Sequence, residues 1–142
     1  MAQNIKNHAR FFPLFHFVVV PLLVFNLIWS IFRVVRHYSA ESLVSLVLAF
    51  ALVLLALAAR LMALTVQDRL IRLEMRLRFA RLLPADLQAR ANDLTVGQYV
   101  SLRFASDEEL PALTRKVIAD NLTDRKAIKQ LVKNWQADLL RA

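Results

Sequence analysis

The chain has 142 residues, of which 58% are hydrophobic and none is cysteine, so disulfides, thiolate nucleophiles and thiol-ligated zinc or iron–sulfur sites are excluded. The formal net charge of +8 is concentrated in residues 60–81, which carry six arginines against two acids, whereas residues 82–142 carry nine basic and eight acidic side chains. This nearly neutral C-terminal part argues against nucleic acid as a partner, although the sequence pI is about 10.8.

Two uncharged apolar runs, residues 11–32 and 43–59, dominate the first half of the chain. As a helix the first run extends about 33 Å, which matches a hydrocarbon core of about 30 Å, and it is too long for a signal-peptide core. The second run reaches residue 64 if Arg60 extends its charge to the interface. We therefore predict an all-α membrane protein, a two-span transmembrane helical hairpin with helices at 11–32 and 43–64. Pro21 is expected to kink the first span.

Lysine and arginine near the spans predict the orientation of the hairpin. Eight of them lie before the first span or after the second, whereas only Arg33 and Arg36 lie in the connecting loop. Because basic residues stay on the cytoplasmic side, residues 1–10 and the C-terminal part are placed in the cytoplasm. The loop at residues 33–42 is then external.

The second span continues as a helix beyond the membrane. Residues 41–83 contain neither glycine nor proline, Ser39 is a plausible N-cap, and Pro84 ends the helix. The helical extension therefore covers residues 65–83. Within it, Glu74 and Arg78 are spaced for an intrahelical ion pair.

Small or apolar side chains follow one stripe of this long helix at steps of three and four. The stripe consists of Ser42, Ser45, Ala49, Leu52, Ala56, Ala59, Ala63, Val66, Leu70, Leu73, Leu77 and Ala80. Small residues let helices approach closely in lipid, and leucines form coiled coils in water, so the sequence predicts helix packing and a coiled coil along the stripe. The stripe either joins subunits or packs the first span against the second.

Two further features lie on the extension. Ile71, Met75, Phe79 and Leu82 form a second apolar face, which predicts a second neighbour for this helix. Basic side chains next to a span attract anionic lipid, and we assign that role to five arginines. They are Arg69, Arg72, Arg76, Arg78 and Arg81.

Residues 84–142 are predicted to form a small helical cytoplasmic domain. Capping-box patterns occur at Thr95 with Gln98 and at Ser106 with Glu109. Thr123 is expected to open an amphipathic helix. Its apolar face consists of Ile128, Leu131, Val132, Trp135 and Leu139. The acidic run 107–109 is interpreted as complementing a helix dipole.

Four segments resemble a family of short bacterial membrane proteins described only as a domain of unknown function. They are NHARFFPLFHFVVVPL (7–22), QDRLIRLEMRLR (67–78), LRFASDEELP (102–111) and IKQLVKNWQADLLR (128–141). The resemblance spans nearly the whole chain. It implies a bacterial inner-membrane location and a two-span hairpin with a cytoplasmic tail, and it implies no activity and no functional residues.

Candidate chemistry is sparse. His16, inside the first span, is a weak candidate for binding a cofactor. His8 and His37 lie about 12 and 32 Å from it along one helix, too far to share a metal ion within a subunit. We assign no catalytic residue, cofactor or metal.

The expected function is that of a non-enzymatic inner-membrane protein, an oligomer or accessory subunit that presents its helical domain to a partner. The expected partners are anionic lipids and either a second copy or another membrane protein. Two alternatives stay open. One is a membrane-tethered nucleic-acid-binding regulator, and the other is a small membrane subunit with an intramembrane histidine site for haem or quinone.

Overall fold

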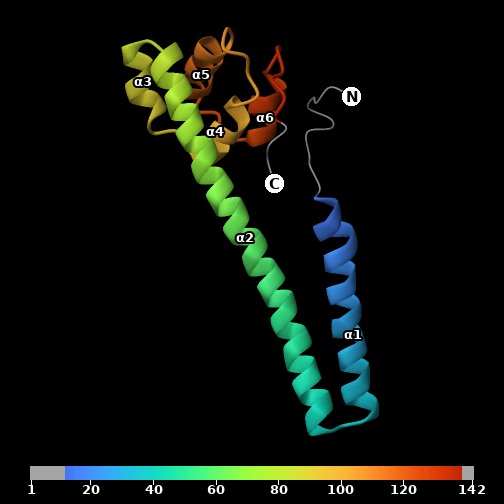
Figure 1. Ribbon diagram of the computed structural model, residues 1–142. Helices are drawn as coiled ribbons and strands as arrows, with labels where there is room; N and C mark the ends of the chain where they lie inside the picture. Colours follow the sequence, from blue (N-terminus) through green and yellow to red (C-terminus); the bar gives the residue numbers. More distant parts are fainter. Residues whose placement is uncertain (1–11, 139–142) are drawn as a thin grey trace. The chain divides into compact units, whose positions relative to one another are not determined.

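The protein is described here by a computed structural model, which covers residues 12–138. Six α-helices follow a short π-helix, and Figure 1 shows their arrangement. The elements are η1 (Leu14–Val19), α1 (Val20–Arg36), α2 (Ala40–Leu82), α3 (Ala85–Ala91), α4 (Val96–Leu102), α5 (Leu110–Ala119) and α6 (Arg125–Gln130). The prediction of an all-α protein with two long apolar helices packed as a hairpin is confirmed. The chain divides between residues 64 and 65 into two compact units.

The hairpin unit contains η1, α1 and the first half of α2. A turn of three residues, 37–39, joins the two helices, so the connection is shorter than the expected loop at residues 33–42. Arg33 and Arg36 lie in the last turn of α1, where the helix dipole favours positive charge. Ser39 caps α2 as predicted, because its hydroxyl accepts the Ser42 N–H at 3.1 Å while the Ser42 hydroxyl accepts the Ser39 N–H at 3.0 Å.

The buried residues in the described part of the hairpin are Ser30, Ser42 and Ala49, all of them small. Most of the large apolar side chains of α1 and the first half of α2 are instead exposed. Both helices are long and apolar enough to cross a membrane. Long apolar helices with an exposed surface of this kind suggest membrane association.

The first helix begins with a π-helical segment just before Pro21. At its end the Val20 N–H donates to the Phe15 carbonyl, five residues earlier. Proline has no N–H, so a regular hydrogen-bond ladder cannot continue through it, and the wider π turn is one known accommodation. The predicted kink is not tested by these contacts and stays a prediction.

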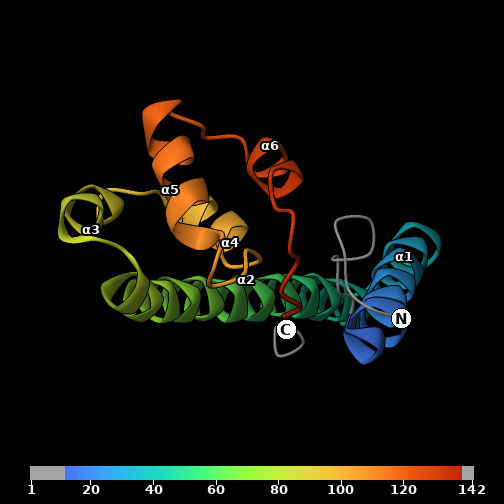
Figure 2. The same cartoon turned by 90° about the horizontal axis from the view of Figure 1, so that it is seen from above.

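The second unit packs α3, α4, α5 and α6 against the C-terminal end of α2, and Figure 2 shows them on one side of that helix. Ile71, Met75 and Phe79 are buried in its core, which confirms the predicted second neighbour. Tyr99 of α4 is fully buried, its ring lies 5.7 Å from that of Phe79, and its hydroxyl donates to the Ala91 carbonyl at 2.8 Å. The extension and the residues after Pro84 therefore share one core.

The expected amphipathic helix that opens at Thr123 is present but shorter than predicted: Ile128 is buried within it, and Leu131, Val132 and Trp135 lie beyond its end. Helix α6 is capped by Asp124, whose carboxylate accepts the backbone N–H groups of Lys126 and Ala127, and it ends at Gln130. The next segment, residues 132–138, carries an isolated β-bridge between Ala105 and Trp135, and we call it the C-terminal strap. Leu139 lies outside the described residues.

Candidate functional site

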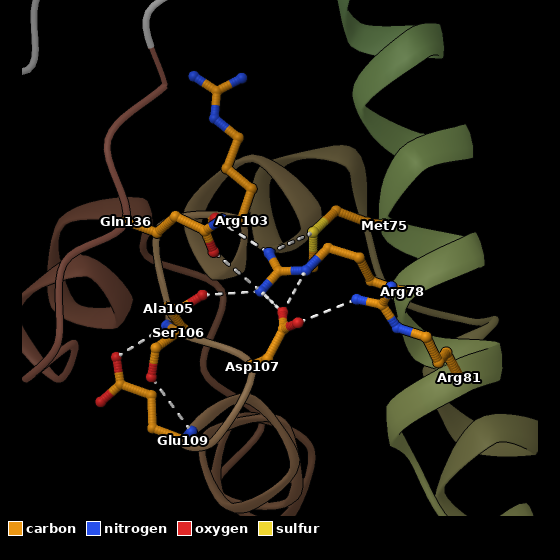
Figure 3. Close-up of polar contacts among 9 residues, drawn as sticks. All are labelled: Met75, Arg78, Arg81, Arg103, Ala105, Ser106, Asp107, Glu109 and Gln136. Atoms are coloured by element: carbon orange, nitrogen blue, oxygen red, sulfur yellow. Dashed lines mark hydrogen bonds and ion pairs between the residues drawn. The ribbon is translucent and has the colours of Figure 1, made fainter.

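Arg78 has several polar partners in the second unit and lies on the face of α2 that meets the domain (Figure 3). Its guanidinium donates to the backbone carbonyls of Arg103 at 3.2 Å and Ala105 at 2.9 Å, and to the side-chain oxygen of Gln136 at 3.2 Å. It also pairs with the Asp107 carboxylate at 2.6 Å. Arg78 thus ties α2 to the segment after α4 and to the C-terminal strap, and we call this cluster the Arg78 centre.

Asp107 receives two arginines. Arg81 contacts its second carboxylate oxygen at 2.9 Å, so Arg78 and Arg81 share one acid. The hydrogen bonds from Arg78 hold the pKa of Asp107 below its ordinary value; burial opposes this, and the charges of both arginines add to it. Arg78 therefore pairs with Asp107, 29 residues along the chain, and not with Glu74 as expected. The interpretation of the acidic run as a complement of the helix dipole stays a prediction.

Glu109 holds the start of the C-terminal strap. The predicted capping box is confirmed, because the Ser106 N–H donates to the Glu109 carboxylate at 3.3 Å and the Glu109 N–H donates to the Ser106 hydroxyl at 3.4 Å. The same carboxylate also accepts the N–H groups of Lys133 at 3.1 Å and Asn134 at 3.2 Å. Since those two amides are bound to Glu109, they do not continue α6, which explains the early end of that helix.

An aromatic stack fixes the rest of the strap. The Trp135 and Phe104 rings are stacked with centroids 4.4 Å apart, and the Gln136 N–H donates to the Phe104 carbonyl at 2.7 Å. The Arg103 guanidinium lies over the Phe104 ring and pairs with Asp138 at 3.2 Å. Charge, stacking and backbone bonds together make the strap a structural part of this unit.

Acid is expected to weaken the Arg78 centre. The folded-state pKa of Asp107 lies below its unfolded value of about 3.9, so its contribution is fully present above that pH and is lost as the pH falls through the folded-state pKa. We expect Asp107→Asn to flatten the fall of stability below about pH 5. Chemical unfolding at several pH values, followed by Trp135 fluorescence in a Trp29→Phe background, measures this.

Some acid dependence should remain in the Asp107→Asn variant. The backbone N–H groups of Ala127 and Lys126 also lower the pKa of Asp124, which this substitution leaves in place. A variant with the full pH dependence of the original chain contradicts the assigned role of Asp107.

The five arginines assigned to lipid fall into two groups. Arg78 and Arg81 are bound to Asp107, and the Arg78 side chain is only 18% exposed. Arg69 and Arg76 are exposed, and the guanidinium of Arg72 lies over the Tyr99 ring at 5.8 Å. Arg78 and Arg81 therefore hold the second unit together, a role that the sequence did not predict.

The small-residue stripe changes environment along α2. Ser42 and Ala49 are buried within the hairpin unit, Ser45, Leu52 and Ala56 are partly covered, and the later members are exposed. The large side chains among the latter are Val66, Leu70, Leu73 and Leu77, at 53–65% exposure. The first part of the stripe is thus covered within the hairpin unit, and its second part is exposed.

The open part has the pattern of a coiled-coil face. With Leu70 at position a and Leu73 at position d of a heptad, every residue from 69 to 81 at positions a, d, e and g is exposed. Every residue at positions b, c and f in that range is buried or partly covered by the domain. We call the exposed set the free face of α2. It consists of Arg69, Leu70, Leu73, Glu74, Arg76, Leu77, Ala80 and Arg81, and the exposed Val66, one heptad before Leu73, extends it.

His16 has a local partner. Its Nδ1 lies 3.0 Å from the Phe12 carbonyl oxygen, and its ring meets that of Phe15 edge to face. Within residues 12–138 no group of three or more His, Cys, Asp or Glu side chains could hold a metal ion. Both of these contacts of His16 lie within its own helix turn.

The sequence missed the Arg78 centre because its partners are far apart along the chain. Asp107 and Gln136 lie 29 and 58 residues from Arg78, and no local spacing rule links them. One indication was available. Three of the four segments that carry the family resemblance, residues 67–78, 102–111 and 128–141, supply the members of this centre.

The comparisons with known proteins place the chain in a family. No curated protein and no solved structure matches it. The match to a family covers residues 1–142, which is the entire chain, and it confirms the resemblance to a family of unknown function. The chain belongs to the family of unknown function DUF6526.

Proposed function

We propose that this chain is a non-enzymatic integral protein of the bacterial inner membrane, with both termini in the cytoplasm. In this proposal it self-associates through α2 and holds its C-terminal unit ready to bind a partner. The observation that carries the proposal is the free face of α2, which follows directly on a hairpin whose own large side chains are exposed.

Membrane insertion would give the hairpin the apolar surroundings that its surface requires. In lipid, the exposed leucines, valines and phenylalanines of α1 and α2 need no protein cover, and every backbone group within a helix is already paired. The excess of lysine and arginine outside the connecting turn supports cytoplasmic termini.

The free face would pair with the same face of a second copy. Leu70, Leu73 and Leu77 are exposed outside the apolar hairpin, and in water the burial of each contributes about 1.5 to 3 kcal/mol. Ala59 and Ala63 are also exposed and extend the stripe toward the hairpin unit with small side chains. Small residues favour close contact between helices in lipid, so one interface can continue through both media.

The charges beside the leucines fit parallel helices, which two copies with the same membrane topology must form. Arg69 at position g faces Glu74 at position e of the partner, and both are exposed. The next such pair would place Arg76 of one copy opposite Arg81 of the other, which are both positively charged. Arg81, however, already pairs with Asp107 of its own chain. One attractive pair on each side of the interface therefore sets the register.

Single cysteines test both the interface and the topology in a chain that has none. We expect Leu73→Cys to form a disulfide-linked dimer on mild oxidation, because paired d positions lie within the distance that a disulfide spans. Ala112→Cys, exposed on α5, is the control and should stay monomeric. In intact cells, a membrane-impermeant maleimide should label Tyr38→Cys but not Leu73→Cys.

Each part of the proposal can fail separately. A Leu73→Cys protein that stays monomeric while it is fully inserted contradicts self-association through the free face. Labelling of Leu73→Cys in intact cells contradicts the cytoplasmic placement of the second unit.

A further inference from the structure

A hollow of about 220 Å³ opens beside the first turns of α2 that belong to the second unit. Thr65, Asp68, Arg69 and Arg72 line it from α2, and Val96 lines it from the start of α4. Two arginines against one acid leave this hollow with a net positive charge.

Arg72 is fixed in place at this hollow. Its guanidinium lies 5.8 Å from the centre of the Tyr99 ring, and its Nε atom is buried and has no hydrogen-bond partner among the described residues. Tyr99 is itself fixed, because it is fully buried and its hydroxyl donates to the Ala91 carbonyl. An arginine held in one orientation loses little freedom when it binds an anion.

Neither Arg69 nor Arg72 forms an ion pair with any described residue, in contrast to Arg78 and Arg81. The acid in the hollow, Asp68, lies on α2 between Thr65 and Arg69. Within one copy, the positive charge of the hollow is therefore available to an external anion, and in the proposed dimer Arg69 would be shared between this anion and Glu74 of the second copy.

The hollow lies at headgroup depth if the hairpin spans a membrane. Counted from residue 64, Arg69 and Arg72 lie about 7.5 and 12 Å along the helix. The headgroup region of one leaflet is about 5 to 8 Å thick. Helical side chains lean toward the N-terminus of their helix, which for α2 is the membrane side, so this tendency brings the Arg69 guanidinium nearer to the lipid phosphates, while the Arg72 guanidinium stays over the Tyr99 ring.

We propose that this hollow, between Arg69 and Arg72 on α2 and Val96 on α4, binds the phosphate of an anionic lipid headgroup. The proposal rests on the proposed membrane insertion of the hairpin. Of the five arginines that the sequence assigned to lipid, the proposal keeps the two that line the hollow.

The test measures lipid bound to the full chain by native mass spectrometry in mild detergent, with phosphatidylglycerol and phosphatidylcholine supplied in equal amounts. Wild type should retain phosphatidylglycerol selectively. Each basic residue near an anionic surface contributes a factor of about five, so Arg69→Gln with Arg72→Gln should lower this retention about twentyfold. Arg76→Gln with Arg115→Gln removes the same charge from two exposed positions outside the hollow and should retain the lipid.

Three other outcomes would contradict the lipid site or its assignment to lipid. Equal loss of lipid in both double variants contradicts a specific site and leaves only a diffuse basic collar. Binding of inorganic phosphate by wild type with no retained lipid overturns the lipid assignment. Because Arg72→Gln removes a contact with the buried Tyr99, Arg69→Gln alone is also measured, and an unchanged retention in that variant contradicts the proposal.

The maleimide experiment above separates this inference from the proposed function. If labelling shows that the hairpin is not inserted, the proposed function fails. If the hairpin is inserted and lipid retention does not depend on Arg69 and Arg72, only the lipid site fails.

Discussion

Arg78→Ala is expected to lower the free energy of unfolding of the C-terminal unit by about 3 kcal/mol. The substitution leaves the carbonyl groups of Arg103 and Ala105, both buried residues, without the donor that satisfies them. It also removes the closest partner of Asp107, which keeps only Arg81. Unfolding followed by Trp135 fluorescence in a Trp29→Phe background measures the change, because Trp135 lies on the C-terminal strap.

Arg76→Ala is the matched control for this prediction. Arg76 lies two residues away on the same helix, is exposed and forms no ion pair among the described residues, so its loss should change stability by less than about 0.5 kcal/mol. Hydrogen exchange in residues 132–138 should accelerate in Arg78→Ala and not in Arg76→Ala. Equal stability of the two variants would falsify the structural role of the Arg78 centre.

The hairpin and the length of α2 could be predicted because their signals are local. An uncharged apolar run, a stretch of 43 residues without glycine or proline, and a serine at the N-cap each act within a few residues of the structure they determine. The same holds for the capping box at Thr95, which the structure reproduces. Local chemistry is sufficient for elements of this kind.

The C-terminal strap could not be predicted because tertiary contacts override a helical pattern there. Ile128, Leu131, Val132 and Trp135 have helical spacing, yet only the first lies within α6. The Glu109 carboxylate binds the amides of residues 133 and 134, and the Phe104 ring stacks on Trp135. Both partners lie 24 to 31 residues earlier in the chain, a separation that a local pattern does not reveal.

The arginines assigned to lipid also depend on tertiary contacts that the sequence does not reveal. From the sequence, the arginines of residues 69–81 are equivalent basic side chains next to a span. The fold separates them by helix face, because the domain covers positions b, c and f of α2 and draws Arg78 inward to Asp107. Charge counting thus predicts a basic collar, and only the packing determines which of its members remain free to bind a ligand.

One helix therefore serves two contacts. The b, c and f positions of α2 bind the domain of the same chain, and the a, d, e and g positions, apart from Arg81, which pairs with Asp107, are left for another surface. This division makes fold and assembly separable by mutation. Met75 and Leu73 lie two residues apart, yet Met75 is 1% exposed and Leu73 is 56% exposed.

Leu73→Glu is expected to dissociate the proposed dimer and to leave the C-terminal unit folded. Two leucines leave the interface, one from each copy, and two carboxylates would have to be buried against each other in their place. The dissociation constant should rise by more than about a hundredfold, which size-exclusion chromatography with light scattering in mild detergent can measure. Met75→Ala should leave the dimer intact and lower the free energy of unfolding of the C-terminal unit by about 2 to 5 kcal/mol, because it opens a cavity in the core. A Leu73→Glu protein that stays dimeric, or one that unfolds as readily as Met75→Ala, contradicts the assignment of the free face to self-association.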